Sequence, residues 1–513
     1  MNRLFVVIIL LFISYSEAKS IDDFLNRNLT FDINGETKSF QRETNQPITA
    51  ISSESWCTVR IKDDNTLIQI TVPPYDDIVK RTATVSVFTD GSSGIIRVTQ
   101  LGRETPPLDN WEGKSEANAR IEQHRKENIR IVVKQNGAPV VGATVDMKMQ
   151  KHEFLFGAYI AKWDRGEPYR KLFADIFNFA TGYFQWREME PTMGAKEYYN
   201  YHTRIADWCR EKNILLKGHL ISSGTEPTWL SSLSNEDALS RVLYFCSELS
   251  GHFKGQVDAW EVINEWINYN AKDPKLTTLF NTFGKADMAK ACFAEARKAN
   301  PNALLMPSDN TYDTQYPDFV KQLKDENGQV IYDAVGIQWH THNHRELLDN
   351  NTLWTVIERL ANLEKPVHIT ELTVVSTLAT SGWNDNNPVS TTPEGELQQT
   401  KDVERLYTLF FSHPSIEAVS WWDFTDLNSW MGAPGGLLRD DMTPKPAYDV
   451  LKKLIKETWT TNEVLETDAS GATNIRAFRG IYKFTVILPN GCRQVFTSVV
   501  RKGENELELN LIL

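Results

Sequence analysis

The chain has 513 residues, of which 41% are hydrophobic and 15 are tryptophan, a composition typical of globular proteins with apolar cores and not of disordered ones. Its length predicts two to four domains. The formal net charge of −12 does not favour binding to nucleic acid or to an anionic membrane, so we expect a neutral or cationic partner. Five scattered cysteines, an odd number, indicate neither a disulfide framework nor a zinc site, and we expect most to be buried thiols.

The first 18 residues have the pattern of a cleavable secretory signal. Arg3 precedes ten apolar residues from Leu4 to Ile13, and Ser16-Glu17-Ala18 provides the small residues of a cleavage site. This run is shorter than the roughly 20 residues that span a bilayer. We therefore expect residues 1–18 to be removed and the protein to be secreted without a membrane span.

Residues 30–102 contain short β-rich runs, such as TLIQITV, TATVSVFT and GIIRVTQ, separated by polar or Gly/Pro turns. This pattern predicts a small β-sandwich. The segment resembles the BACON domain of secreted glycanases from gut Bacteroidetes, with Trp56, Arg81 and the closing RVTQLG at the matching positions. That resemblance implies either a sugar-binding module or a spacer.

The flanks of the central region also predict β-structure. Residues 103–127 are expected to form a linker, and residues 128–150 a hairpin, because Asn136-Gly137 lies between two alternating runs. Short strands recur in residues 459–513. Either these flanking pieces pack together or they pack against the central domain.

Between residues 151 and 458, strand-like apolar runs alternate with helical patterns. Eight alternations in about 300 residues predict an α/β TIM (β/α)8 barrel, with small β-sandwich domains at its N- and C-terminal sides. A doubly wound open sheet is the alternative, but no glycine-rich phosphate loop follows the first strand. The eight runs are FLFGAYI, FNFATGYF, ILLKGHLI, VDAWEVINE, ALLMPSDN, DAVGIQWHTH, PVHITELTV and AVSWWDFTD.

Two of these runs end in a glutamate, Glu265 on the fourth and Glu371 on the seventh. In a barrel of this type the working residues lie at the carboxyl ends of the strands. Cleavage of a glycosidic bond with retention needs one carboxylic acid to protonate the leaving oxygen and one carboxylate to attack the anomeric carbon. The pair therefore predicts this chemistry.

The central domain resembles glycoside hydrolase family 10, the endo-β-1,4-xylanase family, over about 300 residues. The matching segments, with the family pattern in brackets, are Trp260–Glu265 (W-D-V-V-N-E), Gly336–His340 (G-L-Q-S-H), Ile369–Thr373 (I-T-E-L-D), Trp422–Trp430 (W-G-x-T-D-x-x-S-W) and Lys445–Tyr448 (K-P-A-Y).

This resemblance implies a role for each matching residue. Glu265 is the expected acid/base and Glu371 the expected nucleophile. Asn264 would bind the 2-hydroxyl of the sugar at the cut, and His340 would orient the nucleophile. The remaining expected substrate-binding residues are His219, Gln338, Trp422 and Trp430. The family mechanism needs no metal, and the sequence has no cofactor motif.

The sequence departs from the family on one side of the expected cut. Where the family has Glu, Asn and Lys on its second strand, this chain has Thr181, Gly182 and Gln185. A Trp and a His of the third strand are missing at Ser222–Gly224, and Glu226 and Gln185 are candidate replacement contacts. We interpret the small residues as admitting a different glycone, one that is bulkier or substituted.

The resulting hypothesis is a secreted retaining endo-β-1,4-glycanase, similar to xylanases, in the periplasm or on the surface of a Gram-negative bacterium, acting on a polysaccharide. The alternatives are a surface glycan-binding protein with a degenerate barrel, and an exo-acting or aryl-glycoside-cleaving enzyme. The sequence specifies neither the exact glycan nor the oligomeric state.

Overall fold

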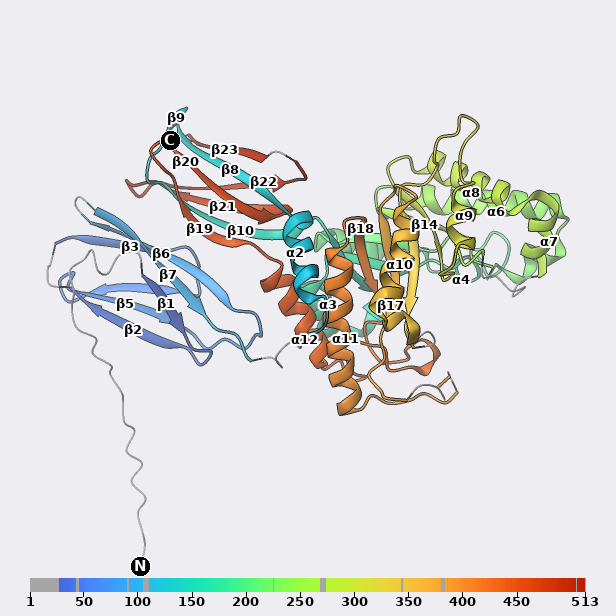
Figure 1. The fold of residues 1–513 in the computed structure, drawn as a ribbon, viewed down its shortest axis with the longest axis horizontal. Helices are drawn as coiled ribbons and strands as arrows, with labels where there is room; N and C mark the ends of the chain where they lie inside the picture. The colour runs from blue at the N-terminus through green and yellow to red at the C-terminus, as the bar shows by residue number, and fades with distance from the viewer. Residues whose placement is uncertain are drawn as a thin grey trace, which may run out of the picture.

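A computed structural model describes residues 27–42, 46–89, 92–104, 110–224, 226–267, 274–342, 345–379, 383–384, 386–503 and 505–512. The expected signal peptide, residues 1–18, lies outside the described residues. Two small β-sandwiches lie beside each other at one end of the long axis, and a barrel surrounded by helices occupies the other end (Figure 1).

The eight predicted strands close into a parallel barrel in sequence order. The predicted fold class is therefore confirmed. Both faces of such strands are covered, which explains why they appear in the sequence as nearly continuous apolar runs. The strands are β11 (Leu155–Tyr159), β12 (Phe179–Tyr183), β13 (Leu215–His219), β14 (Ala259–Asn264), β15 (Leu304–Asp309), β16 (Val335–His340), β17 (Val367–Thr373) and β18 (Ile416–Trp421).

Helices surround the barrel, and their starts carry side-chain caps where the sequence provides them. Ser234 accepts a hydrogen bond from the Asp237 amide before α6, and Thr392 accepts one from the Gly395 amide before α11. Among the described residues, no helix is long and apolar enough to cross a bilayer. The helices are α3 (Glu167–Ile176), α4 (Trp186–Met189), α5 (Tyr199–Glu211), α6 (Asn235–His252), α7 (Pro274–Phe283), α8 (Lys285–Ala299), α9 (Gln315–Val320), α10 (Asn350–Ala361), α11 (Pro393–Ser412) and α12 (Pro446–Lys453).

The N-terminal domain is a sandwich of two sheets, as its sequence predicts. One sheet has the order β1-β7-β6-β3 and the other β2-β5-β4. Arg81 lies between the rings of Trp56 and Tyr75, and it donates to the side chain of Gln100. The residues that resemble the BACON pattern thus meet in one structural cluster. The strands are β1 (Asn28–Phe31), β2 (Glu36–Gln41), β3 (Ile48–Ser52), β4 (Thr58–Lys62), β5 (Leu67–Val72), β6 (Arg81–Thr89) and β7 (Ser92–Gln100).

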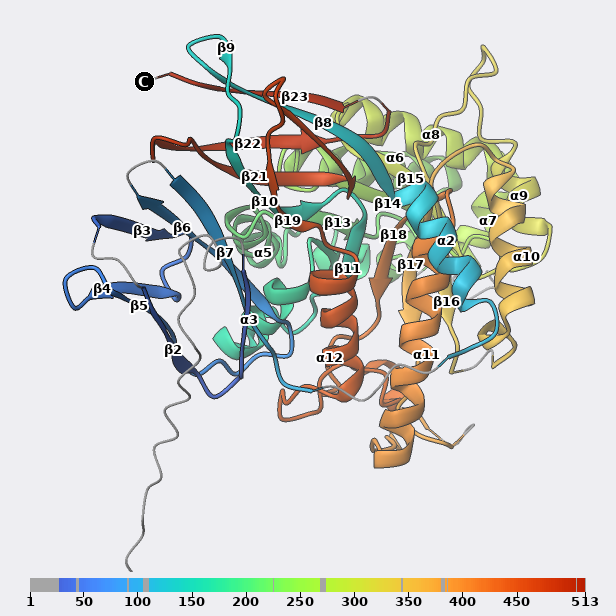
Figure 2. The same ribbon diagram turned by 60° about the vertical axis from the view of Figure 1, so that its left-hand side comes forward.

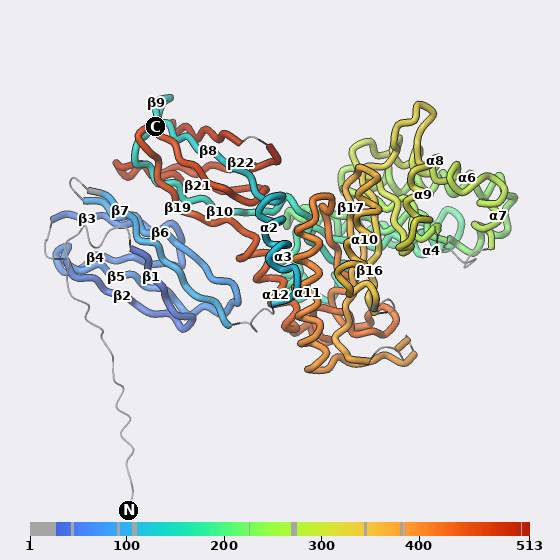
Figure 3. The backbone as a smooth tube through the Cα atoms, in the orientation of Figure 1, coloured from blue at the N-terminus to red at the C-terminus, as the bar shows by residue number. Residues whose placement is uncertain are grey.

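The two flanking β segments pack together into a second sandwich with its own core. One sheet has the order β19-β10-β21-β22, and the other has β20-β8-β23. Strand β8 from before the barrel and β23 from the C-terminal segment run side by side (Figure 3). The strands are β8 (Lys126–Gln135), β9 (Ala138–Pro139), β10 (Thr144–His152), β19 (Asn462–Glu466), β20 (Ala472–Phe478), β21 (Gly480–Ile487), β22 (Arg493–Val500) and β23 (Asn505–Leu511).

The predicted hairpin is present only in part. Asn136 and Gly137 both have positive φ and connect β8 to the short β9. The second alternating run, β10, then crosses to the opposite sheet, where β19 and β21 pair with it. The turn was therefore read correctly from local sequence, whereas the partner of β10 depends on residues more than 300 positions away.

The segment expected as a linker contains a helix, α2 (Lys114–Arg125), packed along α11 (Figure 2). Arg125 is buried and donates to the carbonyl oxygens of Phe411, His413 and Ile416 around the C-terminal end of α11. Trp111 donates to Glu404. These long-range contacts hold the segment from Trp111 to Arg125 against α11 of the barrel. The expectation of a plain linker for this segment was therefore wrong.

Four of the five cysteines are buried in the domain cores, as expected, and Cys492 is partly buried.

Candidate active site

Glu371 lies near the carboxyl end of β17 and is 4% exposed. Its Oε2 is 3.1 Å from Nε2 of His340. Its Oε1 accepts no hydrogen bond among the described residues and lies 3.6 Å from Nδ1 of His219. One oxygen of this buried carboxylate is thus fixed in place, and the other is available for chemistry.

His340 lies between Thr373 and Glu371. Its Nδ1 is 2.8 Å from the hydroxyl of Thr373, which donates to the carbonyl oxygen of Trp422 at 2.7 Å. Its Nε2 is 3.1 Å from Oε2 of Glu371. The ring is thus held on both sides and orients the carboxylate of Glu371.

Glu265 follows β14 directly and adopts a left-handed backbone conformation, with φ of 57°. Its Oε1 accepts a hydrogen bond of 2.9 Å from Nε2 of Gln338, and Asn264 Oδ1 accepts one of 3.2 Å from the same nitrogen. Gln338 is paired in register with Glu371 across β16 and β17. One side-chain amide thus holds Glu265 and Asn264, and it comes from the strand that pairs with the strand of Glu371.

A buried charged cluster lies beneath the nucleophile position. Lys217 forms an ion pair with Glu261, and His219 Nδ1 lies 2.8 Å from the other oxygen of Glu261. Burial tends to raise the pKa of Glu261, but Lys217 and His219 outweigh it and lower that pKa to about 2. Burial tends to lower the pKa of His219, but Glu261 and Glu371 outweigh it and raise that pKa.

A metal ion is not needed to complete this cluster. His219, Glu261 and Glu371 place ligand atoms within 4.8 Å of one another. The ammonium group of Lys217 already supplies positive charge to Glu261. The residues present therefore fit a metal-independent site better than a metal centre.

Aromatic rings form the walls of the site. Trp422 is buried and stacks on Tyr159, with centroids 4.1 Å apart and an angle of 7°. Trp430 is 45% exposed and lies 4.7 Å from the ring of His340. Tyr183 stacks on His219 at 5.9 Å. All eight predicted site residues thus lie at one end of the barrel. Gln338 contacts Asn264 and Glu265, and a second chain of contacts joins Glu371, His219, His340, Trp422 and Trp430.

Comparison with known proteins shows which family shares this arrangement. Residues 145–454 match the model for glycosyl hydrolase family 10. The chain belongs to this family. The relatives include the anti-sigma-I factor RsgI6 of Acetivibrio thermocellus, 29% identical over 434 residues, which are 81% of this chain and 52% of that protein. An endo-1,4-beta-xylanase of Agaricus bisporus is 29% identical over 281 residues, 52% of this chain and 78% of that protein.

The chain thus spans about half the length of the first of these relatives. Solved structures agree with the barrel fold. A GH10 structure from Paenibacillus barcinonensis gives a TM-score of 0.51 at 20% identity, and covers 59% of this chain and 94% of its own. A GH10 endoxylanase from a sugarcane soil metagenome gives 0.50 at 20% identity, with 59% and 97% covered.

The positions that depart from the family 10 pattern are mostly turned away from solvent. Thr181 is fully buried and its hydroxyl lies 2.7 Å from that of Ser420. A Cβ at Gly182 would lie 2.9 Å from the ring of Phe184, so this glycine permits close packing next to β12. Thr181 therefore contributes to the packing of the barrel, and Gly182 leaves the room that the ring of Phe184 needs.

The two candidate replacement contacts also differ from expectation. Glu226 is 1% exposed and accepts a hydrogen bond of 2.5 Å from Ser222, so it is part of the packed interior. Gln185 is partly buried and accepts a hydrogen bond from the hydroxyl of Tyr183. Gln185 is therefore the better candidate, because its side chain is partly exposed and contacts Tyr183 beside His219.

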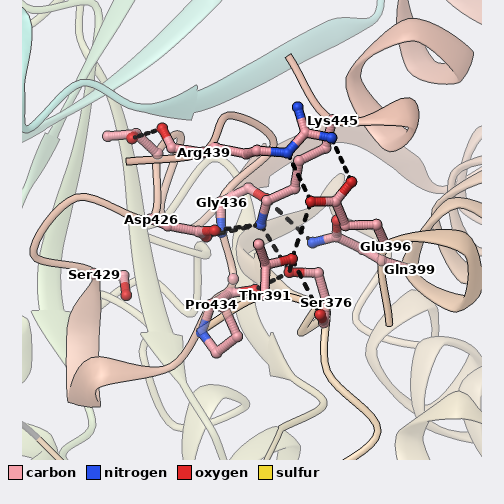
Figure 4. A network of polar contacts seen from close by, with 12 residues as sticks. Ser376, Thr391, Glu396, Gln399, Asp426, Ser429, Pro434, Gly436, Arg439 and Lys445 are labelled. Atoms are coloured by element: carbon pink, nitrogen blue, oxygen red, sulfur yellow. Dashed lines mark hydrogen bonds and ion pairs between the residues drawn. The ribbon is translucent and has the colours of Figure 1, made fainter. Parts of the chain in front are cut away.

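A second polar network holds the loop between β18 and α12 (Figure 4). Lys445 is buried and lies 2.6 Å from Asp426 and 2.8 Å from the hydroxyl of Ser376. Asp426 also accepts a hydrogen bond from the Gly436 amide, and Arg439 pairs with Glu396 nearby. The loop that bears Trp430 is therefore fixed to the loop after β17.

Sequence reasoning missed several side chains of the site. Glu261, Thr373 and Tyr159 touch predicted site residues, and Lys217 pairs with Glu261. All four lie within strands, where a charged, hydroxyl or aromatic residue has no distinctive pattern. Asp423 was also missed. It stands where the family pattern has Gly, accepts a hydrogen bond from the Trp430 amide, and has a pKa raised by burial to about 6.

Proposed function

We propose that this family 10 member is a secreted, retaining endo-β-1,4-glycanase, similar to xylanases, that hydrolyses a plant polysaccharide by double displacement. One observation supports this most: Glu371 is a buried carboxylate with one oxygen bound to His340 and the other unengaged among the described residues. Glu265 accepts a hydrogen bond from Gln338 of β16.

In the first step, Oε1 of Glu371 attacks the anomeric carbon and the leaving sugar departs. Glu265 donates its proton to the glycosidic oxygen, which leaves as a neutral hydroxyl. His340 orients the nucleophile, and the nearby imidazole of His219, whose pKa is raised by Glu261 and Glu371, stabilises its negative charge before attack. The product is a glycosyl ester of Glu371.

In the second step, Glu265 takes a proton from water, which attacks the anomeric carbon and releases Glu371. Two inversions give net retention. The Asn264 amide is positioned by Gln338, so its NH2 group is the part left to bind the sugar 2-hydroxyl. Trp422 and Trp430 offer flat faces for stacking on sugar rings.

The substrate is proposed from the relatives. Several are named endo-1,4-beta-xylanase, including those of Agaricus bisporus, Thermotoga neapolitana and Paenibacillus barcinonensis. A xylan-type backbone is therefore the first choice. The side of the site at β12 lacks the polar substrate-binding side chains of the family pattern, so we propose an atypical glycone subsite.

The N-terminal sandwich is proposed to be a BACON-like module, and the source a bacterium of Bacteroidetes type. The pattern of a secretory signal in the sequence of residues 1–18 supports the proposal of a location in the periplasm or on the cell surface.

The test is reducing-end release from xylan, decorated xylans, β-mannan and β-glucan by the full chain. We expect turnover on at least one β-1,4-linked xylan, with short oligosaccharides of several sizes as early products. Binding to the same glycans without any turnover would contradict the proposal and favour a glycan-binding protein. Release of a single small product from chain ends would favour an exo-acting enzyme.

A further inference from the structure

A cavity of about 460 Å³ lies next to the catalytic centre, at the carboxyl ends of β11 and β12. Its walls come from the loop after β11, from Gly182 and Tyr183 of β12, and from the beginning of α5. Ligand sites in proteins have volumes of about 300–1,000 Å³. The cavity is therefore large enough for a sugar unit.

Two tyrosines belong both to this cavity and to the catalytic centre. Tyr159 lines the cavity and stacks on Trp422, and Tyr183 lines it and stacks on His219. These two rings lie 6.0 Å apart in an edge-to-face arrangement. The cavity thus begins where the aromatic wall of the catalytic centre ends.

The lining combines aromatic faces with hydrogen-bonding groups. Tyr198 and Tyr201 add two further phenol groups. His202 is 6% exposed, and its Nδ1 has no hydrogen-bond partner among the described residues. Burial lowers the pKa of His202 to about 4, so this nitrogen belongs to a neutral imidazole at neutral pH. Buried polar atoms in native proteins are normally paired, which points to a ligand or water here.

The charges around the cavity balance one another. Lys162 and Arg165 contribute two positive charges, and Asp164 and Glu188 contribute two negative charges. No net charge is therefore offered to a uronic acid or another ionic group. Tyrosines that present both an apolar face and a polar hydroxyl suit a neutral sugar, which needs both.

We propose that this cavity binds a neutral glycosyl branch on the glycone side of the substrate. The inference rests on the proposed function, because it places the branch on a chain whose cut lies between Glu265 and Glu371. It also accounts for the departures at β12: Thr181 and Gly182 no longer grip the backbone sugar, and Gly182 lines the cavity instead. On this side of the site, the protein would then recognise the glycosyl branch of the polysaccharide instead of its backbone sugar.

The test uses isothermal titration calorimetry on the full chain with Glu371→Gln, so that no substrate is consumed. The ligands are a linear xylo-oligosaccharide, the same backbone with an arabinofuranosyl branch, and the same backbone with a glucuronosyl branch. We expect the arabinosyl form to bind about tenfold tighter than the linear form, because an added sugar contributes stacking and hydrogen bonds. Equal affinities, or a preference for the glucuronosyl form, would overturn the proposal.

Two variants locate the effect. Ala161→Trp places a large ring in the cavity. Tyr198→Ala removes a lining ring that is largely exposed, so we expect this variant to fold normally. Both should reduce the preference for the branched ligand toward none. Ala294→Trp, at an exposed position on α8, is the matched control and should keep it. A preference that survives both cavity variants would place the branch elsewhere.

Failure of the proposed function would look different. In the enzyme with Glu371 intact, absence of hydrolysis of every ligand would contradict the glycanase assignment, while a branched-ligand preference in calorimetry would still support the cavity. Hydrolysis of the linear and branched forms with equal affinities would contradict the cavity alone.

Discussion

The two sides of the barrel mouth differ in how their polar side chains are held. At β14, β16 and β17, Glu265, Gln338, His340 and Glu371 form contacts with one another. At β12, Thr181 is buried against β18 and Gly182 has no side chain. At β14, β16 and β17, a substitution of one side chain therefore leaves a neighbouring polar group without its partner. At β12, we expect substitutions to alter substrate binding without altering the catalytic residues.

The largest effect is expected from Glu371→Gln. The amide cannot act as a nucleophile, and we expect kcat to fall by about 10⁴-fold or more, as for other nucleophile replacements. Initial rates on xylan measure it. Glu326→Gln, an exposed carboxylate in the loop after α9, is the matched control and should retain full activity. A Glu371→Gln enzyme with near-normal kcat would show that Glu371 is not catalytic.

Glu265→Gln should reduce turnover of xylan by about 10²–10⁴-fold, because it removes the general acid. The loss should shrink for an aryl glycoside with a dinitrophenolate leaving group, which needs no protonation to depart. Comparing kcat/KM on the two substrates measures this. An identical loss on both would contradict the acid role and leave Glu265 as a structural partner of Gln338.

Lys445→Met tests how firmly the loop with Trp430 is fixed. It leaves the carboxylate of Asp426 buried without its cation, and breaking a buried pair in this way costs about 3–5 kcal/mol of the free energy of unfolding. Urea denaturation measures it. The double variant with Asp426→Asn should recover much of the loss. If the double variant is as unstable as the single one, the charge of Asp426 is not the cause.

Asp423→Asn should have the smallest effect, and it should depend on pH. Burial raises the pKa of Asp423 to about 6, so the folded state binds a proton that the unfolded state has already lost. The free energy of unfolding of the wild type therefore falls as pH rises from about 4 to 6, and it stays at this lower value above pH 6. The variant should gain about 3 kcal/mol above pH 6 and little below pH 4.

Thermal or urea unfolding of both proteins at pH 4 and pH 8 measures this difference. The amide of asparagine can still accept the hydrogen bond from the Trp430 backbone. A stability gain of equal size at both pH values would mean that the charge of Asp423 is not responsible.

The sequence predicted the barrel well because each strand is a buried run with a polar end, a pattern that local residues determine. The eight strands and the positions of Glu265 and Glu371 followed from it. The second sandwich was predicted only in outline, because β8 and β23 pair across more than 370 positions and local sequence cannot specify such a pairing. Helix α2 was missed because only Ala117, Ile121 and Arg125 of it are buried, so it shows little apolar periodicity.

The sequence predicted the reactive side chains of the site, but it did not predict the residues that hold them in place. A lysine within a strand, such as Lys217, normally indicates a solvent-exposed face, and its pairing with Glu261 becomes visible only when β13 and β14 are side by side. A different limit applies at Gly182: it lines the cavity, as a small residue suggests, but a side chain there would meet the ring of Phe184, which the sequence does not reveal. Both depend on neighbours from other strands.

The central claim is that Glu371 forms a covalent bond to the sugar. It is tested most directly by incubating the full chain with a 2-deoxy-2-fluoro xylobioside bearing a dinitrophenyl leaving group, which slows release of the intermediate, followed by peptide mass spectrometry. We expect one fluoroglycosyl adduct, on the peptide that contains Glu371, and none in Glu371→Gln. An adduct on another carboxylate, or turnover with no adduct and an inverted product, would contradict the account.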